Sequence, residues 1–394
     1  MAKLGDIFVK QIVGEWGNEC NNESNGVFVL RTTNFSNSGV INYDKVVKRD
    51  IPDNKVEEKK LKYGDIILEK SGGTDKTPVG RVVFCDNKIE SDVYLCNNFT
   101  QAMRVDNSIA IPKYVFYLMY YFHQIGITDL LQSKTTGIRN LRLRDYLNTD
   151  IKLPNLAEQE HCVIYLDKLT VLIFLRQQQL EKLDELVKSR FIELFGDPVA
   201  NSKNWNISSL LSIGYCKNGM NFHTGDNGVD IRCLGVADFK NLSVIDGTEN
   251  LPIVSLNELP SKDSMLKDGD IVFVRSNGNK ALVGRCLLVY PHNIPTTYSG
   301  FCIRFRLTSK QVMPEYLLRV LKSDSISKKM MGRGANIQNL NQQILASLDI
   351  PIPPLDLQNQ FAEFVKQTDK SKVAVQTSIT KCHYLTKKGV NTHG

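Results

Sequence analysis

The sequence lacks the paired cysteines and histidines on which structural metal sites and disulfide frameworks are built. Its nine cysteines include no Cys-x-x-Cys pair, and its six histidines include no two separated by three or four residues. Scattered cysteines of this kind are typical of reduced thiols buried in a core. We therefore expect neither a metal site nor a disulfide scaffold.

Long apolar runs are also missing. No apolar stretch approaches the ~20 residues that a membrane-spanning helix needs. The first residues, MAKLGDIFVKQ, lack the apolar core of a signal peptide. These absences predict a cytoplasmic protein with no membrane partner.

Motifs of common catalytic sites are absent as well. The chain contains no Gly-x-Gly-x-x-Gly, no Gly-x-Ser-x-Gly and no Asn-Pro-Pro-aromatic or Asp-Pro-Pro-aromatic tetrad. In residues 73–81, six residues separate the two glycines and no Lys-Ser/Thr pair follows the second one, so the segment does not match a phosphate loop. The segment PDNKVEEKK, residues 52–60, has the residue types of a metal-dependent nuclease signature. Its carboxylates are too close in sequence for a hairpin between them, so we interpret it as a charged loop. We expect no catalytic residue.

Size and charge set broad limits on the fold and the partners. A chain of 394 residues fits about two domains with connectors. The net charge of +7 is a mild excess that permits nucleic-acid binding without requiring it.

The dominant feature that is present is an internal repeat. LKYGDIILEKSGGTDKTPVGR at residues 61–81 recurs as LKDGDIVFVRSNGNKALVGR at residues 266–285. Three further segment pairs keep the same order: GVFVLRTTNF with GVDIRCLGVADF, PKYVFYLM with PEYLLRVL, and GIRNLRLRDYLNTDIKLPNLAEQE with NIQNLNQQILASLDIPIPPLDLQN. All offsets lie between 199 and 205 residues. This spacing is far above the 20–50 residues of stacking repeats, so it indicates a duplicated domain.

Each copy is expected to be a mixed α/β domain. GDIVFVRS and ALVGRCLLVY have the composition of strands around an Asn-Gly turn. PKYVFYLMYYF and PEYLLRVLKS begin with proline and carry apolar residues at helical spacing. The hairpin tips, SGGTDKT and SNGNKA, differ most, as in a framework that carries different binding loops. Simple divergence of surface turns is the alternative.

A long helix is predicted after each copy. Asn155 and Glu158 can form a capping box at the start of the first helix, and Gly196 and Pro198 can end it. The stretch of some 40 residues from Asn155 to Gly196 contains no proline or glycine before that end. Apolar residues recur there in heptads, which predicts a coiled-coil helix roughly 60 Å long at ~1.5 Å per residue. The second helix has a more polar seam and is expected to be short. The predicted seam residues are Leu166, Leu169, Ile173, Leu180, Leu183, Val187, Phe361, Phe364 and Val375.

The predicted architecture is therefore α/β, with two similar domains separated by two long antiparallel helices that form a coiled coil, and with a pseudo-twofold internal repeat. We predict the first domain at residues 1–154, the first helix at 155–196, the second domain at 197–353, and the second helix with a C-terminal tail at 354–394. The alternative is that each helix folds back on its own domain.

Basic and amide side chains recur in both copies, at the hairpin and just before each long helix. Arg and Lys suit phosphate oxygens, and Asn and Gln can read an adenine edge. A solvated face explains any one of these residues, whereas their recurrence favours DNA contact by the set. The same segments also contain Lys134, Arg144, Lys328, Lys329 and Asn339. The candidate DNA-binding residues are Lys70, Ser71, Lys76, Arg81, Arg139, Asn140, Arg142, Arg275, Ser276, Asn277, Lys280, Arg285, Arg333, Asn336 and Gln338.

Several strings resemble the specificity subunits of type I restriction-modification systems. They are ELVKSRFIELFGDP, NWNISSLLSIG, the twin strings LPNLAEQE and IPPLDLQNQF, and the block GDIVFVRSNGNKALVGR. The resemblance covers nearly the whole chain. It implies that each α/β copy is a target recognition domain for one half of a bipartite double-stranded DNA site, and that the helices are spacers. Since the two copies differ, we expect the site to be asymmetric.

The resemblance also implies partners. Two methyltransferase (M) subunits and motor-nuclease (R) subunits would join this chain, and they would use S-adenosylmethionine and ATP with Mg²⁺. The chain itself would bind no cofactor and carry no active site. Base-reading residues differ between members of this family, so the candidate list above rests on chemistry and position.

Three alternatives stay open. The partner could combine methylation and cleavage in one chain, the protein could be an interaction scaffold that binds no DNA, or one copy could be a divergent nuclease. A steep fall of DNA binding with salt would separate a DNA reader from a scaffold. Metal-dependent cleavage by the isolated chain would support the nuclease.

Overall fold

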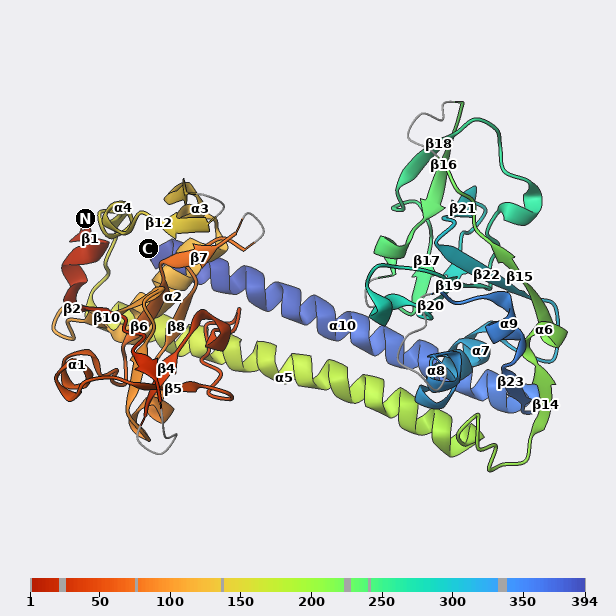
Figure 1. The fold of residues 1–394 in the computed structure, drawn as a ribbon, viewed down its shortest axis with the longest axis horizontal. Coiled ribbons are helices and arrows are strands. Elements are labelled where there is room, and N and C mark those ends of the chain that lie inside the picture. The colour runs from red at the N-terminus through yellow and green to blue at the C-terminus, as the bar shows by residue number, and fades with distance from the viewer. Residues whose placement is uncertain are drawn as a thin grey trace. The chain divides into compact units, whose positions relative to one another are not determined.

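The computed structural model describes residues 2–20, 26–74, 77–135, 138–222, 228–239, 242–331 and 339–393 (Figure 1). The chain divides into two compact units. Unit 1 comprises Met1–Gln178 with Val375–Gly394, and unit 2 comprises Gln179–Ala374. Each unit mixes helices with sheets and includes one part of both long helices.

Unit 1 is built on an antiparallel sheet whose strands lie in the order β2 (Phe8–Val13), β10 (Thr100–Val105), β6 (Ile66–Glu69) and β8 (Val82–Phe84). Other sheets join β3 (Asn18–Glu19), β5 (Val47–Asp50), β4 (Val27–Leu30) and β9 (Tyr94–Cys96); β11 (Gln132–Thr135), β12 (Ile138–Leu141) and β7 (Ser71–Gly73); and β1 (Ala2–Lys3) with β13 (Asp150–Ile151). The helices are α1 (Asp53–Lys59), α2 (Pro112–Gln124), α3 (Ile127–Leu130) and α4 (Leu143–Leu147), with short 3-10 turns η1 (Leu4–Ile7), η3 (Thr32–Asn34) and η4 (Asn87–Glu90).

Unit 2 repeats this plan. Its main sheet has the order β15 (Gly214–Asn218), β22 (Cys302–Leu307), β19 (Asp270–Val274), β20 (Cys286–Tyr290) and β17 (Val244–Asp246). The other sheets join β18 (Ile253–Leu256), β16 (Val229–Leu234) and β21 (Thr296–Tyr298), and β14 (Asn206–Ser209) with β23 (Asp349–Ile352). The helices are α6 (Leu210–Ile213), α7 (Pro314–Leu321), α8 (Asp324–Met331) and α9 (Gln342–Ala346), with 3-10 turns η5 (Val236–Asp238), η6 (Lys262–Ser264) and η7 (Lys280–Leu282).

The repeated string Leu-Lys-x-Gly-Asp has a structural cause in each unit. The Asp65 carboxylate accepts hydrogen bonds from Arg104 Nε and Nη2, both at 2.8 Å, and from the backbone N–H of Lys62. The Asp270 carboxylate holds Arg306 and the N–H of Lys267 in the same way. The glycine before each aspartate has φ = +87°, a left-handed conformation that favours glycine. The ion pair links β10 to the start of β6 in unit 1 and β22 to β19 in unit 2, so the motif is needed wherever this sheet is built.

One sequence-based interpretation was wrong. Residues 53–59 of the segment PDNKVEEKK form α1 and not a loop. Val56 is buried in a small core with Val29, Ile51 and Leu95, which gives the segment an apolar face. The predicted helices at PKYVFYLMYYF and PEYLLRVL are confirmed as α2 and α7.

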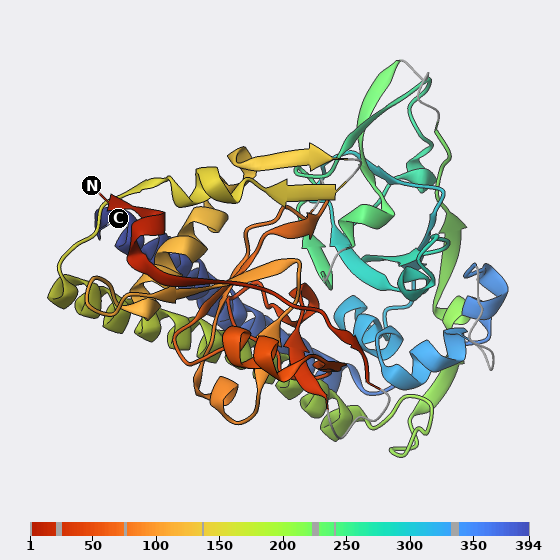
Figure 2. The same ribbon diagram turned by 60° about the vertical axis from the view of Figure 1, so that its left-hand side comes forward.

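The long helices are α5 (Leu156–Phe195) and α10 (Leu355–His393) (Figures 1 and 2). The capping box at the start of α5 is confirmed, because Glu158 N–H donates to Asn155 Oδ1 at 3.0 Å and Asn155 N–H donates to Glu158 Oε2 at 3.2 Å. The expectation of a short second helix was wrong, because α10 has 39 residues against 40 for α5.

The two helices run antiparallel within each unit, as predicted. In unit 2, Asp184 pairs with Lys372 at 2.6 Å, and Phe191, further along α5, lies 5.5 Å from Phe361, earlier in α10. In unit 1, Leu166 of α5 lies against Gly389 near the end of α10. Of the predicted seam residues, Leu166, Leu169, Val187, Phe361 and Val375 are buried, and Ile173, Leu180, Leu183 and Phe364 are half-buried. Val365, Lys372 and Ile379 also occupy low-exposure positions of α10.

One buried glutamine joins each long helix to its unit. Gln159 Oε1 accepts from the N–H of Ile111 at 2.8 Å, and its Nε2 donates to Pro154 O at 2.8 Å. Gln358 repeats the pattern with Met313 and Pro353, also at 2.8 Å. Both side chains are fully buried. These bonds explain why the glutamine of AEQE (residues 157–160) recurs in DLQN (residues 356–359), because the amide ties the first helical turn to the residue before α2 or α7.

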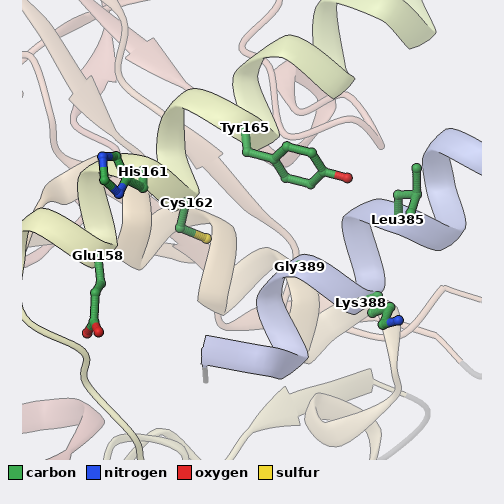
Figure 3. Close-up of a pocket in the computed structure, with 7 residues that line it drawn as sticks. All are labelled: Glu158, His161, Cys162, Tyr165, Leu385, Lys388 and Gly389. Atoms are coloured by element: carbon green, nitrogen blue, oxygen red, sulfur yellow. The ribbon is translucent and has the colours of Figure 1, made fainter.

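The helix ends differ between the units. In unit 1, a groove of about 490 Å³ lies between Glu158, His161, Cys162 and Tyr165 of α5 and Leu385, Lys388 and Gly389 of α10 (Figure 3). In unit 2, Phe361 takes the repeat position of Cys162 and packs against Phe191 and Phe195, which also contact Tyr316. In unit 2, the aromatic cluster therefore occupies the position that corresponds to the groove of unit 1.

Candidate nucleic-acid interface

In unit 1, strand pairing brings two of the predicted segments together. Strand β7 of the hairpin pairs with β12, which precedes α5, so that Asn140 lies opposite Ser71 and Arg139 lies opposite Gly73. The Ser71 hydroxyl donates to Asn140 Oδ1, and the N–H of Leu141 donates to Lys70 O at 2.8 Å. Figure 2 shows β11 and β12 as the adjacent yellow strands. Residues about 70 positions apart in the sequence therefore share one surface.

Unit 2 builds the same junction. Ser276 and Asn339 form an antiparallel bridge, and the N–H of Leu340 donates to Arg275 O at 2.8 Å. Arg275 thus occupies the place of Lys70, and Asn339 that of Asn140. In this copy too, the predicted segment at the hairpin contacts the predicted segment before the long helix.

An exposed phenylalanine supports each junction, and the search for basic and amide residues missed both. The carbonyl of Phe99 accepts from the N–H groups of Lys70 and Ser71 at 3.0 and 3.1 Å, and that of Phe301 accepts from Arg275 and Ser276 at 2.7 and 3.3 Å. The side chains remain 45% and 60% exposed. Aligning NNFTQ with SGFCI would have revealed a phenylalanine repeated at one position. The structure adds that both rings are exposed, and exposed aromatic faces can stack on bases.

Some candidate residues have partners inside the protein. Arg81 donates from Nε and Nη2 to the buried Glu69 carboxylate at 2.7 and 3.0 Å, and this bonding raises the pKa of the Arg81 guanidinium. Arg142 donates to Leu130 O at 2.9 Å and lies 3.3 Å from Asp145. These bonds fix both guanidinium groups in place, which suits a supporting role as well as contact with a ligand.

The other described candidates lie in the junction of unit 1 or in the hairpin of unit 2. Lys70 is half-buried, and burial lowers the pKa of its ammonium group. In unit 2, Asn277 Oδ1 accepts from Asn279 N–H at 2.8 Å, Lys280 opens η7 and is exposed, and Arg285 Nε donates to Ala281 O at 3.3 Å. Four candidates, Lys76, Arg333, Asn336 and Gln338, lie outside the described residues.

Two other kinds of feature are absent from the described residues. They contain no group of three or more His, Cys, Asp or Glu side chains placed to hold a metal ion. In the same part of the chain, no helix is long and apolar enough to cross a bilayer.

Comparison with known proteins agrees with the repeated fold. The family model described as the type I restriction modification DNA specificity domain matches the chain twice, at residues 1–185 and 203–381. The chain is 26% identical over 383 residues to the type I restriction enzyme StySPI specificity subunit of Salmonella potsdam, which covers 91% of this chain and 79% of that protein. It is 23% identical over 388 residues to the EcoKI specificity subunit of Escherichia coli (strain K12), with the same coverage.

Two solved structures share the fold. One comes from work on complex assembly and conformational transition of the type I R-M system, with a TM-score of 0.61 and 16% identity over 100% of this chain and 96% of that chain. The other is the type I restriction-modification S subunit from M. genitalium, with a TM-score of 0.52 and 14% identity over 99% of this chain and 94% of that chain.

Proposed function

Because this chain belongs to the family of type I restriction modification DNA specificity proteins, we propose that it is a specificity subunit that reads a bipartite, asymmetric site in double-stranded DNA. The observation that carries this proposal is the junction built twice with the same backbone hydrogen bonds. Each copy presents a serine, an amide, a cation and an exposed phenylalanine on one surface. These groups suit base edges, phosphates and base faces.

The differences between the copies support an asymmetric site. The framework bonds are kept, whereas Lys70 is exchanged for Arg275 and the tips SGGTDKT and SNGNKA differ in length and sequence. An arginine can bond a guanine edge bidentately, which a lysine cannot match in geometry. The two units would therefore read different short sequences.

We further propose that the chain is non-catalytic and binds no cofactor of its own, and that it acts with M subunits and motor-nuclease R subunits. Its relatives are named as specificity subunits of type I restriction enzymes, which supports the assignment of DNA recognition to this chain and of catalysis to other subunits. The partners would supply S-adenosylmethionine and ATP with Mg²⁺. Two M subunits would match the two units, and the complex would act on DNA in the cytoplasm.

The test is to map methylated bases in a methylation-free host that expresses this chain with its M subunits. We expect one new motif with two unlike specified segments and an unread gap. A host with the M subunits alone is the control and should gain no motif. A continuous palindromic motif, or no new motif, would contradict the proposal.

Arg275→Ala tests the junction directly. We expect weaker binding by ~1–3 kcal/mol if the guanidinium reads a base, together with relaxed discrimination in one half of the site only. The measurement is the affinity of the complex for duplexes altered in one half at a time. Lys70→Ala is the matched variant and should affect the other half. An equal loss for every duplex would instead indicate phosphate contact.

A further inference from the structure

The two units each contain a cavity at the same place in the repeat. In unit 1, a cavity of about 640 Å³ is lined by Glu69, Arg81 and Tyr120, among others. In unit 2, a cavity of about 350 Å³ is lined by Arg285, Lys322 and Ser327, among others. The strands correspond closely, because Glu69 N–H donates to Arg81 O and Val274 N–H donates to Arg285 O, both at 2.8 Å.

The walls of the two cavities differ in charge. In unit 1, the Arg81 guanidinium faces the Glu69 carboxylate. In unit 2, Val274 takes the place of Glu69 and Lys322 takes the place of Tyr120, and each exchange makes the wall more positive by one charge. The described residues that line the unit 2 cavity include two cations and no Asp or Glu.

The cations of unit 2 repel one another. Burial lowers the pKa of Lys322, Arg319 and Arg285 lower it further, and Cys286 and Asp184 oppose the shift. Asp184 and Asp369 of the long helices lie near Arg319 and favour its charge. Lys322 Nζ donates to the neutral Ser243 hydroxyl at 2.8 Å. An anion in the cavity would relieve this repulsion.

The end of helix α7 offers a competing explanation. Carbonyl groups at a helix C-terminus attract cations, which accounts for Arg319 in the last turn and Lys322 at the C-cap. It does not account for Arg285, which comes from the hairpin just before β20. Two separate elements thus deliver positive charge to one cavity.

We propose that the unit 2 cavity bounded by Arg285, Lys322 and Ser327 binds a phosphate group, and that the equivalent cavity of unit 1 does not. A DNA backbone phosphate and free inorganic phosphate are the two sources with this chemistry. The first source rests on the proposed function, since Arg285 adjoins the junction that we assign to DNA. In that case unit 2 anchors the backbone at a point that unit 1 lacks.

Lys322→Gln in the complex with its M subunits tests the proposal. Each neutralised phosphate contributes about 0.9 to the slope of log affinity against log salt. We therefore expect the slope to fall by about one and the affinity at 0.1 M salt to fall about eightfold. Lys310→Gln, the loss of an exposed lysine elsewhere in unit 2, is the matched control and should keep the slope. Circular dichroism melting establishes that both variants are folded.

A second arm uses inorganic phosphate as the probe. Thermal stabilisation by phosphate over chloride at equal ionic strength, lost in Lys322→Gln, with an unchanged DNA slope, would identify free phosphate as the ligand. A variant that matches the wild type in both arms would overturn the phosphate site. Absence of DNA binding by the wild-type complex would instead contradict the proposed function and leave the phosphate arm to decide.

Discussion

Asp270→Ala is expected to lower the free energy of unfolding by about 3 kcal/mol, because removing one partner of a buried ion pair leaves the other uncompensated. The Asp270 side chain is 1% exposed and that of Arg306 is 13% exposed. The variant would leave Arg306 with Met265 O and the more distant Asp263, and would remove the acceptor of the Lys267 N–H. Differential scanning calorimetry should show a midpoint lower by roughly 6–12 °C for the affected unit.

Asp268→Ala is the matched control for Asp270→Ala. Asp268 lies two residues earlier, its side chain is 54% exposed and it accepts the N–H of His292 at 3.0 Å, so we expect a loss of about 1 kcal/mol, well below that of Asp270→Ala. Asp65→Ala should repeat the large loss in unit 1, where Asp65 holds Arg104. Equal midpoints for Asp270→Ala and Asp268→Ala would show that the repeated ion pair contributes little to stability.

Gln358→Leu is expected to cost a similar amount by a different route. Leucine fits a buried site but cannot bond, so the N–H of Met313 and the carbonyls of Pro353 and Gln311 would lose their partner. Each buried group left unsatisfied costs about 1–3 kcal/mol. We expect a total loss of about 3 kcal/mol in urea unfolding, together with poorer assembly, because the amide joins α10 to the residue before α7.

Gln360, two residues after Gln358, provides the control for this variant. Gln360 is exposed in the same helix, so Gln360→Leu should change the free energy of unfolding by no more than about 0.5 kcal/mol. Gln159→Leu should reproduce the large effect in unit 1. If Gln358→Leu unfolded at the same urea concentration as Gln360→Leu, the amide would not anchor the helix.

Much of the fold could be predicted because the residues that make its main constraints occur twice in the sequence, in the same order. In both units, equivalent hydrogen bonds are made by the aspartate of Leu-Lys-x-Gly-Asp and by the glutamine of the long helix. The glycine before each aspartate has the same positive φ. These residues are therefore kept in both copies of the sequence. The length of α10 could not be predicted in this way. Its seam contains Thr368 and Lys372, and Lys372 is held there by Asp184, a contact that apolar periodicity does not detect.

The candidate site was predicted in part. Ser71 with Asn140 and Ser276 with Asn339 meet because strand pairing joins segments that the repeat had already marked. Residue type alone could not show that Arg81 faces Glu69, since the two are 12 residues apart in the sequence. Residue type also gave no reason to select Phe99 and Phe301, which are notable because their apolar rings are exposed beside the junctions and not buried in a core.

The division of the chain into units has a consequence for biosynthesis. Leu166 and Leu169 of unit 1 share a core with Cys382 and Leu385, which the ribosome adds more than 200 residues later. The nascent chain would therefore expose this half of the seam while all of residues 179–374 are being translated. Such exposed apolar surface invites aggregation, so a chain that ends before α10 is expected to be less soluble than the full chain.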